Sequence, residues 1–197
     1  MRAATFDAKA AAERLRQCSR IAVLGSGGAG KSTASRVLAQ TLGLPLWHLD
    51  ALYWLPGWQA RPNAEWASMQ RELVQADRWI VDGDYQRTLA IRLERADGVL
   101  FLDLPRLICL RRAAWRAIRL YGRVRPDIGE GCPEHLDLEF FAWIWSFPRR
   151  TRGRLLAARD AAPREQIWVV PRSPREVRQL LSELQALADR QPSGRKT

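Results

Sequence analysis

Short apolar runs alternate along the chain with longer segments of helical periodicity. The apolar runs cover residues 21–25, 44–50, 78–83, 98–104 and 166–171, and polar residues do not alternate within them. Such runs are typical of strands buried on both faces, and helix-length connections between them favour a parallel sheet. The pattern therefore predicts an α/β fold with a core of five parallel strands.

The segments between these runs have the length and periodicity of helices. Residues 31–42, 62–76 and 105–120 each place apolar side chains at helical spacing. Residues 173–188 do the same and begin with Ser-Pro-Arg-Glu, a sequence that caps helix N-termini. Residues 136–145 predict a further helix with an aromatic face. Helices on both faces of the sheet would make a three-layer sandwich.

A stretch rich in Gly, Pro and charge at residues 122–133 interrupts this order. We expect it to belong to a mobile, lid-like insertion at about residues 120–150. A chain of 197 residues buries enough surface for one sizeable core. We therefore expect a single domain over residues 1–197, acting as a monomer, with a frayed basic tail at residues 190–197.

The composition favours an anionic partner. The chain carries 32 Lys and Arg against 21 Asp and Glu, a formal net charge of +11. Nucleotide, nucleic acid and acidic lipid would each satisfy this charge. Most of the excess is arginine, which suits bidentate phosphate contacts, although a coding bias from lysine to arginine gives the same composition. Only arginines in a defined geometry therefore identify a site.

Three features of the chain favour the cytoplasm. No apolar run approaches the ~20 residues that a membrane-spanning helix needs, so we expect no membrane association. The N-terminal residues carry charges throughout and lack the apolar core of a secretory signal. Cys18, Cys109 and Cys132 have no paired spacing for a disulfide or metal site, which fits a reducing compartment.

The strongest chemical signal is Gly-Ser-Gly-Gly-Ala-Gly-Lys-Ser at Gly25–Ser32, between the first apolar run and the first helical segment. This is the phosphate-binding P-loop pattern in its required strand and helix context. A glycine-rich turn that matches by chance is the alternative, and the flanking pattern argues against it. We expect ATP and Mg²⁺ to bind here, through Gly25, Ser26, Gly27, Gly28, Ala29, Gly30, Lys31, Ser32 and Thr33.

Three of these residues have distinct expected roles. Lys31 should contact the β and γ phosphates and be catalytic, with its ammonium facing solvent in the nucleotide-free protein. The Ser32 hydroxyl should ligate Mg²⁺, and Thr33 should donate to an α-phosphate oxygen. Backbone N–H groups and the dipole of the following helix would complete the anion site.

Magnesium at a P-loop also needs an acidic residue at the end of a neighbouring strand. Asp50, Asp82 and Asp103 each end an apolar run. We assign Asp82 to the magnesium shell, because Asp-Gly at a strand end leaves the carboxylate at the sheet edge beside the P-loop. We assign Asp50 to the acceptor side. Each aspartate also fits a strand-end or helix-capping role, which we prefer for Asp103.

The helix predicted at residues 105–120 carries arginines on one face. Like charges at helical spacing destabilise a helix, so the stripe favours a compensating anion, although a solvated cationic face is the alternative. A closing lid would bring such arginines to the transferring phosphoryl group, so we expect Arg112 and Arg116 to be catalytic. The arginines are Arg112, Arg116, Arg119 and Arg123. The rival apolar stripe, expected to face inward, is Leu107, Leu110, Trp115 and Ile118.

An aromatic cluster follows the second apolar run. Tyr53, Trp54 and Trp58 lie within Asp-Ala-Leu-Tyr-Trp-Leu-Pro-Gly-Trp. These rings would either stack on the ring of an acceptor or cover the core, and the sequence leaves both interpretations open.

Taken together, the segments DALYWLPGW, WIVDGDYQRT, FLDLPR and RPDIGEGCPE resemble the adenylate-kinase-like proteins labelled FlaR, or topology modulation protein. The resemblance covers residues 20 to 180. It implies a five-stranded parallel core with a lid, and the family label implies an effect on DNA topology.

Against adenylate kinases themselves, VDGDYQRT resembles the segment usually written Asp-Gly-Phe-Pro-Arg. This implies a magnesium-shell role for Asp82 and an acceptor-phosphate role for Arg87, although the arginine is displaced by one position. Arg112 and Arg116 keep the spacing of the lid-hinge arginines that contact ATP. Arg61 is a weaker candidate for the acceptor-site arginine.

Two functions follow from these observations. The first is an enzyme that transfers the γ-phosphoryl group of ATP to a small acceptor, such as a nucleoside monophosphate, under an arginine-rich lid. The second is a nucleic-acid-associated ATPase or regulator that affects DNA topology, favoured by the net charge and the family label. The sequence does not identify the acceptor.

Overall fold

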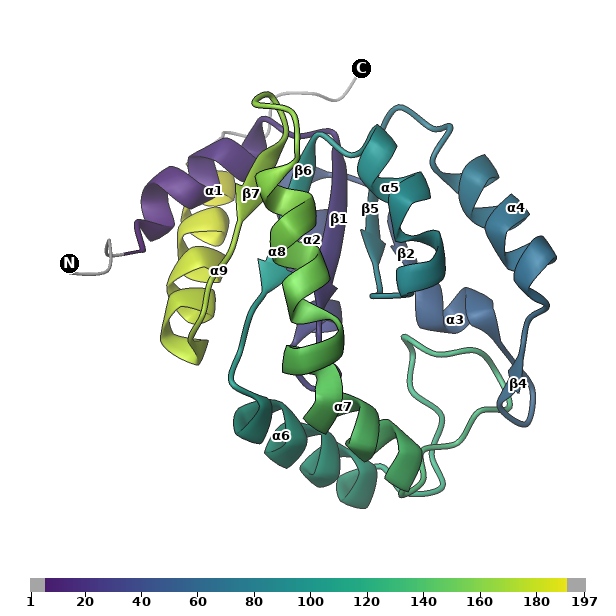
Figure 1. Cartoon of the computed structure of the whole chain (residues 1–197). Helices are drawn as coiled ribbons and strands as arrows, with labels where there is room; N and C mark the ends of the chain where they lie inside the picture. Colours follow the sequence, from purple (N-terminus) through teal and green to yellow (C-terminus); the bar gives the residue numbers. More distant parts are fainter. Residues whose placement is uncertain (1–5, 191–197) are drawn as a thin grey trace.

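A five-stranded parallel sheet forms the centre of the protein, whose computed structural model describes residues 6–190 (Figure 1). The strand order is β2-β5-β1-β6-β7, and every pairing is parallel. All five predicted strands are confirmed, each within about three residues of its expected ends. Their bounds are β1 Arg20–Gly25, β2 Leu46–His48, β5 Trp79–Asp82, β6 Gly98–Leu102 and β7 Ile167–Val169.

Helices cover both faces of this sheet. Successive strand residues point to opposite sides, and because both sets are apolar, both faces must be buried. In β1, Ile21 and Val23 belong to one buried cluster, whereas Ala22 and Leu24 belong to the other. The first cluster packs against α1 (Ala8–Arg16), α2 (Lys31–Leu42) and α9 (Pro174–Asp189). The second packs against α3 (Leu49–Tyr53), α4 (Asn63–Leu73), α5 (Leu89–Arg95) and α8 (Arg152–Asp160). The predicted three-layer sandwich is therefore confirmed.

The predicted helices are present, and several short elements were not predicted. Residues 31–42 form α2 with the expected ends. The capping signal before α9 is confirmed, because the Ser173 side chain accepts a hydrogen bond from the backbone N–H of Glu176. The other predicted helices are α4, α6 (Arg106–Arg119) and α7 (Leu138–Arg150). The additional elements are α1, α3, α5, α8, a 3₁₀ turn at Gln86–Thr88, and the antiparallel pair β3 (Trp54–Leu55) and β4 (Gln59–Ala60).

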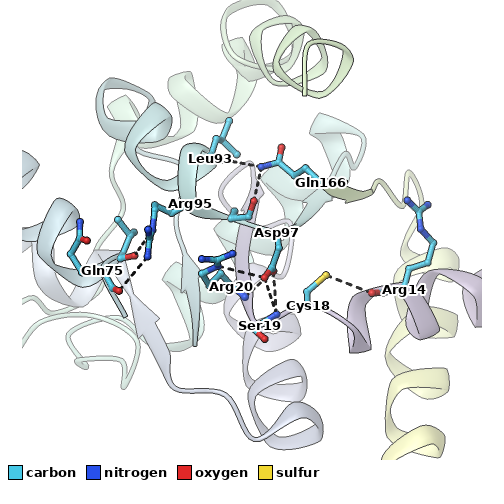
Figure 2. A network of polar contacts seen from close by, with 11 residues as sticks. Arg14, Cys18, Ser19, Arg20, Gln75, Leu93, Arg95, Asp97 and Gln166 are labelled. Carbon is cyan, nitrogen blue, oxygen red and sulfur yellow. Dashed lines mark hydrogen bonds and ion pairs between the residues drawn. The ribbon is translucent and has the colours of Figure 1, made fainter. Parts of the chain in front are cut away.

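One aspartate joins three strands at the edge of the sheet opposite the P-loop. The Asp97 carboxylate accepts hydrogen bonds from the backbone N–H groups of Ser19 (3.1 Å) and Arg20 (2.8 Å) and pairs with the Arg20 side chain (Figure 2). Its carbonyl accepts from the N–H of Ile167. Asp97 thereby joins the first residues of β1, β6 and β7. The P-loop lies at the other end of these strands.

The predicted lid-like insertion consists of α7 and a crossing loop, which we define as residues 120–137. The loop runs from α6, below the sheet, to α3 and β4 (Figure 1). There the Gly57 N–H donates to Gly131 O (2.9 Å), Trp58 Nε1 donates to Pro133 O (3.0 Å), and the Cys132 thiol contacts Leu55 O. The crossing loop is therefore docked on the β3–β4 hairpin in this structure. Its mobility stays a prediction.

Two further observations bear on the sequence predictions. No helix within residues 6–190 is long and apolar enough to cross a membrane. The predicted frayed tail falls outside the described residues, apart from Arg190 at the end of α9.

The inward face of α6 differs from the prediction. Leu107, Trp115 and Ile118 are 66%, 63% and 62% exposed, and the buried positions are Cys109, Ala113 and Ala117. Of the predicted apolar stripe, only Leu110 packs against the core. The buried side chains are small because α6 lies directly on the P-loop. The prediction used hydrophobicity, whereas the distance between two backbones decides which face turns inward.

A pair of substitutions tests this orientation. Ala113→Leu should destabilise the protein by about 1–3 kcal/mol, because the added methylenes have no space beside the P-loop. Leu107→Ala should change the free energy of unfolding by less than about 0.5 kcal/mol, because its side chain is mostly exposed. Urea unfolding followed by circular dichroism measures both. The reverse order of effects would show that Leu107 faces the core.

Candidate functional site

The P-loop connects β1 to α2 and has the backbone geometry of an anion-binding turn. Gly28 and Gly30 have φ angles of 74° and 98°, which glycine adopts without strain. At Gly28 a side chain is also excluded sterically, because a Cβ would lie 2.2 Å from Cys109 O. Gly30 caps α2 without a side-chain hydrogen bond, so the first N–H groups of this twelve-residue helix stay available to a phosphate.

Lys31 folds back onto the P-loop. Its Nζ donates hydrogen bonds to Gly25 O (2.9 Å) and Ser26 O (3.1 Å). The expectation that this ammonium faces solvent in the nucleotide-free protein is therefore wrong. The two carbonyls hold the charge at the mouth of the loop, which is where a β or γ phosphate would meet it.

A single cavity of about 1320 Å³ brings most of the predicted residues together. It lies between the P-loop and α6 on one side and α3, α4 and the loop after β5 on the other, with the crossing loop along it. We call the first side the nucleotide half and the second the acceptor half. The predicted residues that line it are Gly27, Gly28, Ala29, Gly30, Lys31, Ser32, Thr33, Asp50, Arg87, Arg112 and Arg116. Gly25, Ser26, Arg61 and Asp82 do not line it.

Two arginines of α6 point into the nucleotide half. The Arg112 guanidinium reaches the P-loop, where Nη1 lies 3.4 Å from Ala29 O. One turn later, Arg116 Nε lies 3.1 Å from Glu134 Oε1. Arg119 and Arg123, which continue the predicted stripe, are exposed and lie outside the cavity lining. The stripe therefore divides into a cavity-facing pair and a solvated pair.

The crossing loop adds three charged residues that the sequence analysis did not single out. Arg125 pairs with Glu134 (2.5 Å) and with Asp127 (2.9 Å), and all three line the cavity. Together with Arg116 they form a network of two cations and two anions. Burial, followed by the neighbouring Arg125 cation, lowers the pKa of Arg116. The only sequence signal for this network was the charge-rich segment RPDIGEGCPE.

Asp127 reaches the P-loop residue expected to ligate magnesium. Although burial works in the opposite direction, the Arg125 guanidinium and the nearby Ser32 hydroxyl hold the pKa of Asp127 below its usual range. The carboxylate is therefore ionised at neutral pH, beside Ser32.

Asp82 lies at the end of β5, paired in register with Val23 of β1 and His48 of β2. It is 4% exposed, and its Oδ2 lies 2.8 Å from His48 Nδ1. The predicted position of Asp82 at the end of its strand is observed, whereas its contact with His48 had no signal in the sequence. Asp82 is thus held behind the P-loop, next to the cavity rather than in its lining.

Asp50 is one of two carboxylates, with Asp84, that line the cavity from the acceptor half. Tyr85 Oη donates a hydrogen bond to Asp50 Oδ1 (2.7 Å). Burial raises the pKa of Asp50, while the Lys31 cation and the Tyr85 hydrogen bond oppose that rise. Asp103, in contrast, forms a bidentate pair with Arg152 (2.7 and 2.9 Å), which agrees with the structural role preferred for it.

A buried arginine organises the loop that carries Tyr85. Arg92 is fully buried in α5, and its guanidinium donates to Gly83 O (2.5 Å), Asp84 O (2.8 Å) and Tyr85 O (3.3 Å). Burial lowers its pKa to about 10, so it stays charged at neutral pH. The same loop holds Tyr85 at a φ of 24°, a strained value for a residue with a side chain. The structural role of Arg92 was not predicted, because the helix that carries it, α5, was not predicted.

The two arginines expected on the acceptor side occupy different places. Arg87 is exposed at the cavity rim, with Nη1 3.4 Å from Asn63 Oδ1. Arg61 points away from the cavity lining. Its Nε donates to Leu52 O (2.9 Å), and its Nη1 pairs with Glu65. Arg61 therefore links α3 to α4 through these two contacts, and its geometry does not favour the contact with an acceptor that we expected.

Comparison with solved structures assigns the fold. The chain resembles a shikimate kinase from Bacteroides thetaiotaomicron, with 16% identity, a TM-score of 0.53, and coverage of 87% of this chain and 99% of that one. A shikimate kinase from Acinetobacter baumannii in complex with shikimate gives 18% identity, a TM-score of 0.52, and coverage of 92% and 99%. This likeness shows the fold of the P-loop kinases.

Comparison by sequence gives no family assignment. No protein-family model matches the chain, and no curated protein matches it either. The resemblance to the topology modulation proteins therefore stays a prediction.

The role of Arg92 can be tested against a neighbour on the same helix. Arg92→Met should destabilise the protein by about 3 kcal/mol, because it leaves buried carbonyl groups without donors. Arg95→Met is the matched control, because Arg95 makes only longer hydrogen bonds to Val74 O (3.3 Å) and Gln75 O (3.4 Å). Its cost should stay below about 1 kcal/mol. Equal midpoints of urea unfolding for the two variants would contradict the role assigned to Arg92.

Proposed function

We propose that this protein is an ATP-dependent phosphotransferase that moves the γ-phosphoryl group of ATP to a hydroxyl of a small acceptor. The observation that carries this proposal is that Lys31 and Asp50 line one cavity from opposite halves. A phosphate-binding cation and a carboxylate able to accept a proton thus face the same space. The fold shared with kinases of a small molecule, shikimate, supports the same class.

The nucleotide half would bind the phosphates and neutralise their charge. N–H groups of the P-loop and the N-terminus of α2 would hold the β phosphate, and Lys31 would contact the β and γ phosphates. Arg112 is placed to add a second cation there. Arg116 sits one turn further along the same cavity and would reach the transferring group once nucleotide competes with Glu134 for its guanidinium. Such fixed charges favour the transition state because charge moves toward them as the reaction proceeds.

The acceptor half would supply the base. Asp50 would take the proton of the acceptor hydroxyl as its oxygen forms a bond to the γ phosphorus. The bond between that phosphorus and the β–γ bridging oxygen breaks, and ADP leaves with the bonding electrons. Tyr85 would orient the Asp50 carboxylate through its hydrogen bond. Arg87, at the rim, would contact an acceptor that fills the cavity.

The residues near Ser32 fit a magnesium ion. The Ser32 hydroxyl, the Asp127 carboxylate and the Asp82 carboxylate behind the loop are oxygen donors, which magnesium prefers. Residues 6–190 contain no group of three or more His, Cys, Asp and Glu that could hold a metal unaided. Phosphate oxygens and water would provide the other ligands of a magnesium ion here. When bound, magnesium would neutralise charge on the β and γ phosphates.

An acceptor panel tests the proposal. Purified protein with ATP, Mg²⁺ and a set of nucleosides, nucleotides, sugars and hydroxy acids should yield ADP and one phosphorylated product, detected by mass spectrometry. Lys31→Ala should lower that rate at least about 100-fold, because Lys31 acts on charge that develops in the transition state. It should also cost about 1–3 kcal/mol of stability, because two hydrogen bonds from a charged group are lost.

Arg123→Ala is the matched control for Lys31→Ala, since it removes a cation that is exposed and outside the cavity. Its turnover should equal that of the wild-type protein. A folded Lys31→Ala protein with wild-type turnover would refute the P-loop as the active site. ATP hydrolysis without transfer to any acceptor would refute the phosphotransferase.

The dependence of activity on pH tests the role of Asp50. A base must be ionised, so kcat/KM should fall as pH decreases through the pKa of Asp50, which burial holds above that of an ordinary aspartate. Tyr85→Phe removes a hydrogen bond that favours the carboxylate, so the pKa should rise further. The acid limb of the profile should then move to higher pH.

Tyr53→Phe provides the control, because it removes a hydroxyl from the ring that packs on Tyr85 at 4.8 Å. The position of the acid limb should not change in this variant. A Tyr85→Phe profile that coincides with the wild-type profile would remove Asp50 as the titrating base.

A further inference from the structure

The acceptor half of the cavity is walled by aromatic side chains. We define this aromatic wall as Tyr53, Trp54, Trp58, Trp66 and Tyr85, all of which line the cavity. Successive rings touch, with centroids 4.9 Å apart for Tyr53 and Trp54, 5.1 Å for Tyr53 and Trp66, and 5.5 Å for Trp54 and Trp58. They come from α3, the β3–β4 hairpin, α4 and the loop after β5. Four separate segments therefore bring apolar ring surface to one side of the cavity.

Two buried polar groups lie in the same half. Trp66 is 3% exposed and Asp84 is 6% exposed, and both line the cavity. Trp66 Nε1 and Asp84 Oδ1 have no hydrogen-bond partner among the described residues. Buried polar groups normally have partners, so these two atoms keep unused hydrogen-bonding capacity beside the cavity. Both atoms are themselves shielded, so a ligand reaches them only after a small movement of the two side chains. One donates and the other accepts, which matches the hydroxyl group, since a hydroxyl does both.

The charges of the acceptor half disfavour a second phosphate. Asp50 and Asp84 contribute two carboxylates to its lining. Of the two arginines expected to hold an acceptor phosphate, Arg61 points away from the cavity and Arg87 is exposed at the rim. Burial already raises the pKa of both Asp50 and Asp84, so this half of the cavity disfavours negative charge. A phosphomonoester dianion placed against the wall would add two further negative charges, whereas a neutral hydroxyl would find a hydrogen-bond partner.

We propose that the acceptor half binds a neutral, polyhydroxylated ring compound, a sugar or a nucleoside, that stacks on the aromatic wall and presents a hydroxyl to Asp50. The proposal rests on the proposed function, because it names the acceptor class for the same cavity. It replaces the nucleoside monophosphate expected from the resemblance to adenylate kinases. Aromatic faces bind sugar and base rings through the same stacking contact, and hydroxyls complement the polar groups beside them.

Matched ligand pairs test the proposal on the full chain by isothermal titration calorimetry. Uridine is compared with uridine monophosphate, and glucose with glucose 6-phosphate, in the presence of Mg²⁺ and a non-hydrolysable ATP analogue that occupies the nucleotide half. We expect uridine or glucose to bind in the millimolar range or tighter, and its phosphomonoester to bind at least about tenfold more weakly. The preferred pair distinguishes a nucleoside from a sugar.

Two tryptophan variants locate the binding. Trp54→Ala removes one ring of the wall and should weaken binding of the preferred compound by about tenfold, the size of one stacking contact. Trp115→Ala is the control, because Trp115 is exposed on α6 and lies outside the cavity lining. Trp66→Phe keeps a ring and removes the indole N–H, so it should weaken binding less than Trp54→Ala does.

The outcomes separate this inference from the proposed function. Tighter binding of a phosphomonoester than of its parent, failure of both neutral compounds to bind, or equal binding by Trp54→Ala and Trp115→Ala would overturn the inference. Phosphorylation of a monophosphate in the acceptor panel would retain the kinase and also overturn the inference. Binding of uridine or glucose without phosphoryl transfer would retain the inference and refute the kinase.

Discussion

The contact between α6 and the P-loop is the constraint on which the rest of the site depends. A Cβ at Gly28 would lie 2.2 Å from Cys109 O and 3.2 Å from Ala113 N, so the two backbones touch with no side chain between them. This close approach turns the small residues of α6 inward. The helix then directs Arg112 into the cavity one residue before Ala113, and Arg116 one residue before Ala117. The position of these two arginines follows from the small size of the residues beside them.

The ion pairs among Arg116, Arg125, Asp127 and Glu134, here called the charge network, connect α6 in the nucleotide half to the crossing loop and the acceptor half. Ions removed from water need partners, and the four members of the network balance one another, two cations against two anions. Because Glu134 pairs with both Arg116 and Arg125, it ties α6 to the crossing loop. That loop is anchored in turn at the β3–β4 hairpin, through Gly131 and Pro133. A phosphate that drew Arg116 away from Glu134 would therefore weaken the contact between α6 and the crossing loop, which also contacts Trp58 of the aromatic wall.

Elements with a strong local signal were predictable, and contacts between distant elements were not. The five strands and α2 follow from apolar runs and from the P-loop, because both patterns are continuous in sequence. The prediction of which face of α6 turns inward was wrong, because α6 packs against a backbone rather than against side chains. The His48 contact with Asp82 and the three contacts of Arg92 depend on strand register and on a short helix with little apolar periodicity. Arg61 shows the same limit, because its partners Leu52 and Glu65 could be known only after folding.

The two halves of the cavity arise from different parts of the fold, which explains why they were not equally predictable. The nucleotide half is built on β1 and α2, at the centre of the sheet shared with the shikimate kinases. The acceptor half is built on α3, the hairpin, α4 and the crossing loop, which lie outside the sheet. At 16–18% identity the sheet keeps its topology while such peripheral segments are free to change. The acceptor class that we propose therefore rests on local chemistry, namely the aromatic wall and the carboxyl groups of Asp50 and Asp84, rather than on the fold.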